Sequence, residues 1–172
     1  MLPTFITIII IVAIIVLWAI STQRKLVVLD ENIRNAMSQI GVQLSSRFDA
    51  LTALLDFIKS YNRQKGETLI ESVESGRRMI TAKSTPDDVL HQEEIISDIL
   101  DRVAAVTDQY PELATTLTYI QSMDAVEIFE YMMRTSRLIY NDCVKKLNCE
   151  IRRFPVFIIA GLLGFRQRVY LE

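Results

Sequence analysis

The sequence begins with an apolar run that carries no charged side chain, FITIIIIVAIIVLWAI at residues 5–20, and Leu2 extends it. A bilayer core of roughly 30 Å needs about 20 helical residues, so this run is just long enough to cross a membrane. Trp18 lies near one end, where an indole ring prefers the headgroup level. The alternative, a cleavable signal peptide, needs a basic start and a small-residue cleavage site, and the run has no basic start and no clear site. We therefore predict an uncleaved membrane anchor over residues 1–22.

The charges beside this run predict its orientation. Arg24 and Lys25 follow it, whereas no Lys or Arg precedes it. Positive residues next to a span stay on the cytoplasmic side, so we expect a single-pass protein of the cytoplasmic (inner) membrane with its N-terminus outside. Cys143 and Cys149 fit that reducing compartment as free thiols. Their spacing matches no zinc motif, and His91, the sole histidine, is remote in sequence.

After the anchor, apolar residues recur in steps of three or four, as on one face of a helix. The first series is Ile33, Met37, Ile40, Leu44, Phe48, Leu51, Leu55 and Ile58. It predicts a long amphipathic helix over residues 26–62 that continues the membrane helix without a break. Gly66, in RQKGET, is interpreted as the signal that ends this helix.

Three further helices are predicted at residues 67–83, 86–109 and 111–153. Ser84 or Thr85 caps the second of these and Pro86 takes its first position, while Pro155 closes the last one. Short connections favour antiparallel neighbours.

The predicted fold class is therefore all-α. One N-terminal transmembrane helix is followed by an antiparallel up-and-down helical bundle at residues 23–153, with two long helices and two shorter ones between them. A short apolar tail follows at residues 154–172.

The direction of the helices predicts where the tail lies. The first bundle helix leaves the membrane and the last one returns, so we expect residues 154–172 near the bilayer. The tail is apolar with bases around it, as in a segment that lies on a membrane. The predicted membrane-proximal basic residues are Arg24, Lys25, Arg152, Arg153, Arg166 and Arg168. The tail could pack on its own bundle, lie in the bilayer interface or bury against a neighbouring subunit.

Polar residues line the edge of the apolar face of the last helix. In the first bundle helix, one arginine lies within that helix's own apolar face. Because buried charges must be paired and hydrogen-bonded, we expect the arginines to meet Glu130 in an interhelical network that the asparagines complete. Such a network fixes register more than it adds stability. The predicted network residues are Arg47, Glu130, Arg134, Arg137, Asn141 and Asn148.

Catalysis would need a nucleophile or a perturbed base in a pocket. The sequence contains no H-E-x-x-H, G-x-S-x-G or phosphate-loop motif. We therefore expect no enzyme activity, no catalytic residues, no cofactor and no metal site.

Four stretches of the chain resemble the LemA family. They are NAMSQIGVQLSSRFDAL at residues 35–51, DQYPEL at 108–113, SRLIYNDCV at 136–144 and NCEIRRFP at 148–155. The matching positions are Ala36, Ser38, Gln43, Leu44, Arg47, Asp49, Tyr110, Pro111, Leu113, Arg137, Tyr140, Asn141, Asn148, Phe154 and Pro155. The chain departs from the family at Met37, where a Trp is frequent, and in LTALLD at residues 51–56 and RQKGE at residues 63–67.

The resemblance implies a membrane-anchored antiparallel helical bundle that faces the cytoplasm, and it implies no established reaction. Members of the family are often found beside a membrane metalloprotease of the stress response, and some occur in magnetosome membranes. The leading expectation is a non-enzymatic membrane scaffold or adaptor that acts through helix contacts and self-association. A role in envelope stress or quality control is an association only.

Two alternatives stay open: a membrane-shaping or lipid-binding protein that works through residues 154–172, and a hydrolase with an unrecognised site. The expected partners are the lipid bilayer, further copies of the chain and another membrane protein such as a stress-response metalloprotease. Nucleic acid is not an expected partner.

Overall fold

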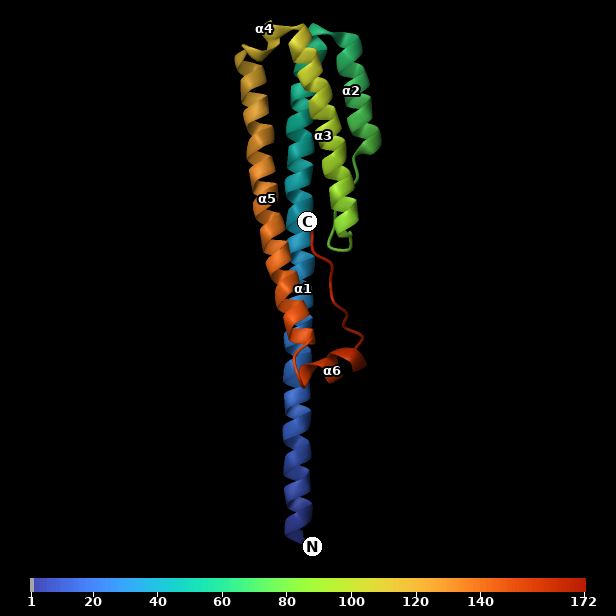
Figure 1. The fold of residues 1–172 in the computed structure, drawn as a ribbon, viewed down its shortest axis with the longest axis vertical. Helices are drawn as coiled ribbons and strands as arrows, with labels where there is room; N and C mark the ends of the chain where they lie inside the picture. Colours follow the sequence, from blue (N-terminus) through green and yellow to red (C-terminus); the bar gives the residue numbers. More distant parts are fainter. Residues whose placement is uncertain (1) are drawn as a thin grey trace.

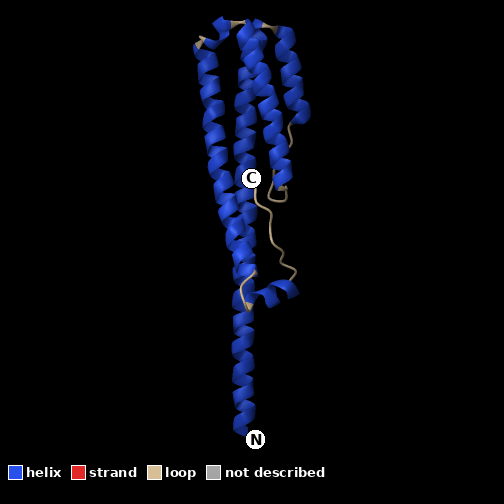
Figure 2. Ribbon diagram, in the orientation of Figure 1, coloured by secondary structure: helices blue, strands red, loops and turns tan. Residues whose placement is uncertain are grey.

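The chain folds into helices alone. The computed structural model describes residues 2–172, with side chains from residue 4 onward, and in this range it has six helices and no strand (Figures 1 and 2). Their bounds are α1 Leu2–Tyr61, α2 Arg63–Gly76, α3 Pro86–Gln109, α4 Pro111–Ala114, α5 Leu117–Ile151 and α6 Val156–Leu162. The predicted all-α bundle, with two long helices and two shorter ones between them, is confirmed.

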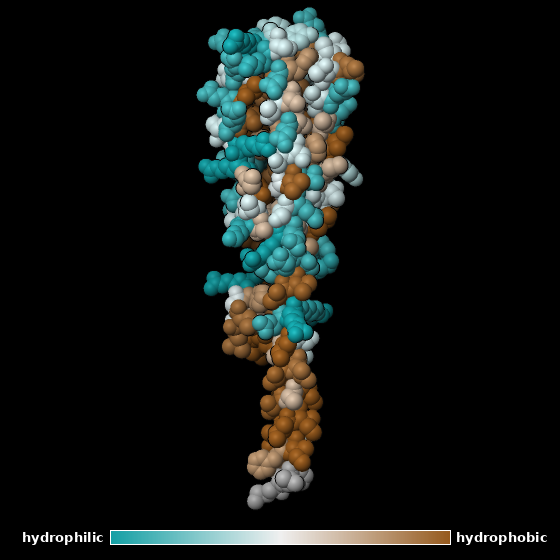
Figure 3. All heavy atoms as spheres, turned by 180° about the vertical axis from the view of Figure 1, so that it is seen from behind, coloured by the Kyte–Doolittle hydropathy of each residue, from teal (hydrophilic) through white to brown (hydrophobic). Residues whose placement is uncertain are grey.

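Helix α1 changes its surroundings along its length without a break. Between Phe5 and Leu17 the large apolar side chains are half exposed or more, whereas Leu26 is completely buried. Within the described residues, α1 is the one helix that is long and apolar enough to cross a membrane, judged by length and composition. Figure 3 shows this part as an apolar stalk below a more polar bundle. The prediction that the apolar helix continues into the first bundle helix is confirmed.

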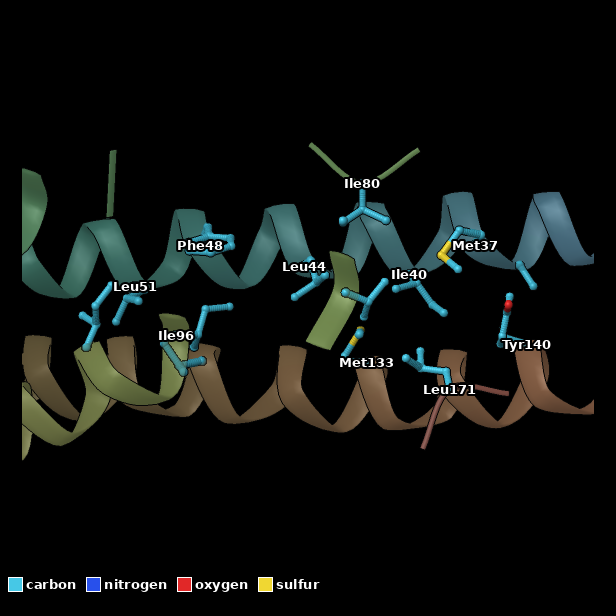
Figure 4. Close-up of a cluster of buried hydrophobic side chains, with 14 of the residues drawn as sticks. Met37, Ile40, Leu44, Phe48, Leu51, Ile80, Ile96, Met133, Tyr140 and Leu171 are labelled. Carbon is cyan, nitrogen blue, oxygen red and sulfur yellow. The ribbon is translucent and has the colours of Figure 1, made fainter. Parts of the chain in front are cut away.

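The core of the bundle lies between α1 and α5, and α3 closes it. Met37, Ile40 and Leu44 of α1 lie opposite Met133 and Tyr140 of α5 (Figure 4). Each fully buried side chain of this kind contributes about 1.5–3 kcal/mol relative to exposure. The helices alternate in direction as predicted, with α1 and α3 leaving the stalk and α2 and α5 returning towards it (Figure 1).

The first connection differs from the prediction. Helix α1 ends at Tyr61, and Gly66 lies inside α2 instead of ending a helix. The Asn62 side chain accepts a bond from the Lys65 amide, 3.1 Å, and so starts the new helix at once. A Cβ at Gly66 would lie 2.4 Å from Lys59 Cα, so the glycine allows the two helices to approach closely.

The predicted second helix is wrong beyond Gly76, because residues 77–85 are not helical. Gln92 of α3, 1% exposed, accepts a bond from the Arg78 amide and donates to the Gly76 carbonyl. Ile80 of this segment points towards α1 and is buried there (Figure 4). Its carbonyl oxygen would lie 2.2 Å from a Cβ at Gly41, so a glycine is required where the segment crosses α1.

Helix α3 begins as predicted, with Pro86 after a Thr85 cap that exchanges bonds with Asp88. The predicted last helix is divided. The hydroxyl groups of Thr115 and Thr116 donate to the carbonyl groups of the preceding turn at 2.8 and 2.7 Å, and α4 ends there.

The apolar tail divides into two parts that lie in different places. Helix α6 lies across the base of the bundle, beside α1 (Figure 1). Residues 165–172, here called the terminal segment, then turn back and run up the bundle, so the C-terminus lies beside its middle (Figure 1). The prediction that the whole tail stays at the base is therefore wrong for the terminal segment, because α5 offers it hydrogen-bonding partners higher up.

Candidate functional site

Two asparagines of α5 hold the main chain of the terminal segment. The Asn148 side-chain amide donates to the Arg168 carbonyl, 2.9 Å, and its oxygen accepts from the Arg168 amide, 2.8 Å. Asn141 forms the same two bonds with Leu171, both at 2.8 Å. Each side chain thus makes the pair of bonds that a neighbouring β-strand would make.

The spacing of the two asparagines matches an extended chain. Seven helical residues between Asn141 and Asn148 rise about 10.5 Å. Three extended residues between Arg168 and Leu171 span about 10 Å. The terminal segment runs antiparallel to α5, because Arg168 is held by Asn148 and Leu171 by Asn141. The two spacings therefore fix the register of the segment.

Two further residues of α5 complete the set, which we call the α5 clamp: Arg137, Tyr140, Asn141 and Asn148. The Tyr140 hydroxyl donates to the Val169 carbonyl, 3.1 Å. Burial raises the pKa of Tyr140, although Arg168 opposes the shift, so the hydroxyl keeps its proton at neutral pH. Arg137 lies 3.4 Å from the Glu172 main-chain oxygen.

Side chains of the terminal segment add further contacts, and Phe165 is one of those packed against the core. Leu171 is completely buried and points into the core beside Tyr140 (Figure 4). Arg168 pairs with Asp30 of α1 at 2.7 Å. A cavity of about 590 Å³ lies next to the segment, between α1 and the start of α3, and Gln167, Arg168 and Val169 form part of its wall. The terminal segment is therefore part of the bundle and also closes one side of this cavity.

The predicted polar network is divided between two places. Arg47, 7% exposed, lies 3.0 Å from Glu130, which also pairs with Arg134 at 2.5 Å. Burial lowers the pKa of Arg47, and the carboxylates of Glu130 and Glu93 oppose the shift. Loss of Glu130 would leave a buried cation without its hydrogen-bonded acid, which costs about 3 kcal/mol.

The remaining network residues have other partners than predicted. Arg137 pairs with Glu93 of α3 and not with Glu130. Asn141 and Asn148 bind the terminal segment and do not complete the network around Arg47. The prediction was wrong here because it considered pairs of helices alone, whereas an extended segment lies along this edge of α5.

Several of the predicted membrane-proximal basic residues form ion pairs near the base. Lys25 and Arg153 lie 2.8 and 3.5 Å from Glu150, and Arg168 pairs with Asp30. The Arg152 guanidinium donates to the Asn148 carbonyl, 3.3 Å. Arg24 and Arg166 are exposed. The base is thus a basic surface that is partly neutralised by its own acids.

The outer face of α5 carries an unexpected row of exposed apolar side chains, here called the α5 stripe. Leu138 and Ile139, for example, are 71% and 46% exposed. With a rotation of about 100° per residue around the helix axis, the stripe falls on the side opposite the buried face of α5. Its members are Leu117, Ile120, Ile128, Tyr131, Met132, Leu138 and Ile139.

Helix α6 and the turn before it expose a second apolar surface, the α6 patch. Its members are Phe154, Phe157, Ile158, Leu162 and Leu163. Figure 3 shows it as an apolar projection at the level where the stalk meets the polar bundle. The patch and the exposed part of α1 are therefore neighbours.

Within the side chains that the structure describes, no three His, Cys, Asp or Glu residues are placed to hold a metal ion. Cys143 and Cys149 are free thiols, and burial raises the pKa of Cys143. The arrangement is suited to binding through main-chain bonds and apolar surfaces.

Comparison with known families gives a match to the LemA family over residues 36–172. The chain belongs to the LemA family. The matched residues include both the α5 clamp and the terminal segment that it holds, so the two belong to the LemA domain together. The resemblance predicted from the four sequence stretches is confirmed.

Two curated relatives are similar over a shorter part. They are the magnetosome proteins MamQ 2 and MamQ 1 of Paramagnetospirillum magneticum (strain ATCC 700264 / AMB-1), each 32% identical over 73 residues. The match covers 42% of this chain and 27% of each relative, so the chain spans about a quarter of their length.

Sequence reasoning identified both asparagines of the clamp but missed what they bind. It also missed Asp30 as the partner of Arg168, Glu93 as the partner of Arg137, and the burial of Leu171 in the core. A signal was present in the sequence, because a seven-residue helical spacing of asparagines equals three residues of extended chain. Gly41 was missed as well, although a glycine inside a helical pattern often marks a close approach.

The α5 clamp can be tested by Asn148→Leu. Two lost hydrogen bonds, at about 1 kcal/mol each, raise the open population of the terminal segment about 30-fold. With Arg166→Gln in every chain, which removes the exposed cleavage site two residues earlier, we expect trypsin to cleave after Arg168 faster by a similar factor, measured by intact-mass spectrometry of the full chain in detergent. The matched control, Asn35→Leu on an exposed position of α1, should leave the cleavage rate unchanged. Equal rates in both variants would contradict the clamp.

Proposed function

We propose that this LemA-family protein is a non-enzymatic, membrane-anchored scaffold that acts through helix contacts and self-association. The observation that carries the proposal is the α5 stripe. A helix whose apolar arc exceeds about 100° normally buries that arc against a partner. Helix α5 already packs one face on α1, and the stripe on the opposite face is left exposed.

The continuity of α1 supports this proposal. The same helix supplies the apolar stalk and the central core of the bundle, so a neighbour bound at the stripe would stand at a fixed distance from the membrane. Anchoring also confines all copies to one plane and raises their effective concentration for contacts between bundles. The occupant of the stripe in this proposal is a second copy. Another membrane protein, such as a stress-response metalloprotease, would be a further partner of such a scaffold, and nucleic acid would not.

The proposed location is the cytoplasmic membrane, with the N-terminus outside and the bundle inside. Arg24 and Lys25 support this orientation, because they follow the apolar helix and no base precedes it.

A second candidate function is lipid binding at the membrane surface. The α6 patch favours it, because it exposes apolar side chains where the stalk meets the bundle and has Arg152, Arg153 and Arg166 beside it. A short helix with an apolar face and flanking bases lies in the interface of an anionic bilayer. The patch would then hold the base of the scaffold on the membrane.

Self-association through the α5 stripe can be tested by Tyr131→Glu with Leu138→Glu. Two charges on exposed apolar positions should convert assemblies into monomers without unfolding the bundle, since both side chains are more than 70% exposed. Mass measurement of the full chain in nanodiscs would show this. The control is Ser97→Glu with Ala104→Glu, which has the same spacing on the exposed side of α3. A wild-type chain that is strictly monomeric would refute the scaffold.

The orientation can be tested in intact cells with a membrane-impermeant thiol reagent. In a chain with Cys143→Ser and Cys149→Ser, we expect labelling of Thr4→Cys and no labelling of Gln64→Cys until the cells are opened. The opposite pattern would place the bundle outside.

Lipid contact of the α6 patch can be measured with a fluorophore on Gly161→Cys, because a Cβ at Gly161 meets nothing within 4 Å. In a chain with Cys143→Ser and Cys149→Ser, brominated lipids should quench this fluorophore. They should leave a fluorophore on Glu71→Cys of α2 unaffected. Quenching should fall when Phe157→Ser and Leu162→Ser are added. No quenching at position 161 would exclude the second function.

A further inference from the structure

The α5 clamp binds its segment through main-chain atoms. Asn141, Asn148 and Tyr140 bond to amide and carbonyl groups of the terminal segment and to no side chain of it. Main-chain groups are the same in every extended chain. The clamp is therefore a site for an extended peptide, of the kind that pairs with a sheet edge, but built from helix side chains.

Two contacts select the sequence of the bound segment. Leu171 fills a completely buried position, so an apolar side chain is required there. Three residues earlier, Arg168 pairs with Asp30 at 2.7 Å. The preferred ligand is thus an extended segment with a cation and, three residues later, an apolar residue. The last eight residues of this chain have that chemistry.

The connection to the terminal segment is sparsely packed. Gly164 has a φ of +76°, and a Cβ at Gly161 or Gly164 would meet nothing within 4 Å. The α6 turn ends with a bond from the Phe165 amide to the Ala160 carbonyl, and the next main-chain contact is that of Arg168 with Asn148. The two residues between them are exposed. Within the terminal segment, a short exposed link of two residues therefore joins Phe165, which packs against the core, to the part that the clamp holds.

The anchor places every clamp and every terminal segment at the same height and with the same polarity. A segment that crosses to a neighbour makes the same bonds as one that stays, so contact energy does not separate the two arrangements. The local concentration of neighbours and the conformation of the link decide between them.

We propose that the α5 clamp binds the terminal segment of a second copy, so that neighbouring scaffold molecules exchange residues 168–172 of this segment. The inference rests on the proposed self-association and gives it a structural basis beyond the α5 stripe. The clamp then acts as the receptor and the terminal segment as the ligand of a contact between bundles.

The test uses two full-length chains with different tags, both with Cys143→Ser and Cys149→Ser. One carries Asp30→Cys and the other Arg168→Cys, so the clamp and Leu171 remain intact. After co-expression and reconstitution into liposomes, a short bismaleimide should link the two tags. We expect this linking to exceed several-fold that of a control in which Glu71→Cys replaces Arg168→Cys.

The direction of the contact distinguishes exchange from mere proximity. Asn141→Leu with Asn148→Leu in the Asp30→Cys chain should abolish linking, because that chain supplies the clamp. The same pair in the Arg168→Cys chain should preserve or increase linking, because it frees that chain's own segment. Should the leucine variants fold poorly, Leu171→Ser in the Arg168→Cys chain should reduce linking instead.

Two results would overturn exchange. One is a yield of crosslinked chains that is the same whichever chain carries the Asn141→Leu and Asn148→Leu pair. The other is crosslinking that occurs only when a single chain carries both cysteines. Assemblies that persist in nanodiscs alongside either result would leave the scaffold proposal standing and remove exchange alone.

Discussion

The packing of α5 against α1 is the contact on which the rest of the structure depends. Helix α1 is continuous from the apolar stalk to the far end of the bundle, and α5 returns along its buried half. Met133 and Tyr140 meet Met37 and Ile40 across this contact (Figure 4). Helices α2 and α3, α6 and the terminal segment take their places relative to this pair. Any surface of α5 is thereby fixed relative to the stalk.

One helix, α5, presents three different surfaces. One face is buried on α1, the opposite face carries the α5 stripe, and the edge between them holds the α5 clamp. A single helix in water usually needs only one apolar face. The exposed apolar face and the main-chain-binding edge are the two surfaces on which the proposed contacts between proteins are based.

At the lower end of the bundle, two exposed apolar surfaces lie next to a group of basic residues. The α6 patch lies beside the exposed part of α1, and Lys25 and Arg153 meet there on Glu150. Pairing with Glu150 reduces the positive charge available to lipid headgroups. Arg24, Arg152 and Arg166 would supply the remaining attraction in the proposed membrane contact.

Periodicity in the sequence was enough to predict the class of fold, the two long helices and their alternating direction. It also predicted the start of α3, because a Thr85 cap and Pro86 are local signals. The start of α2 at Arg63 and its end at Gly76 were misplaced. There the chain's path depends on Asn62 and Gln92, and Gln92 bonds to main-chain groups about fifteen residues away in sequence.

The sequence by itself determined that Arg47 and the asparagines of α5 are special, because polar residues at buried helical positions need partners. It did not determine the partners. The pairing of Arg47 with Glu130 was predicted because both residues lie on long helices, whose buried faces can be identified from the spacing of the apolar residues. Asn141 and Asn148 bind a segment without any period, and only the tertiary structure places it. The physical reason is that main-chain groups, which every residue carries, leave no mark in the sequence.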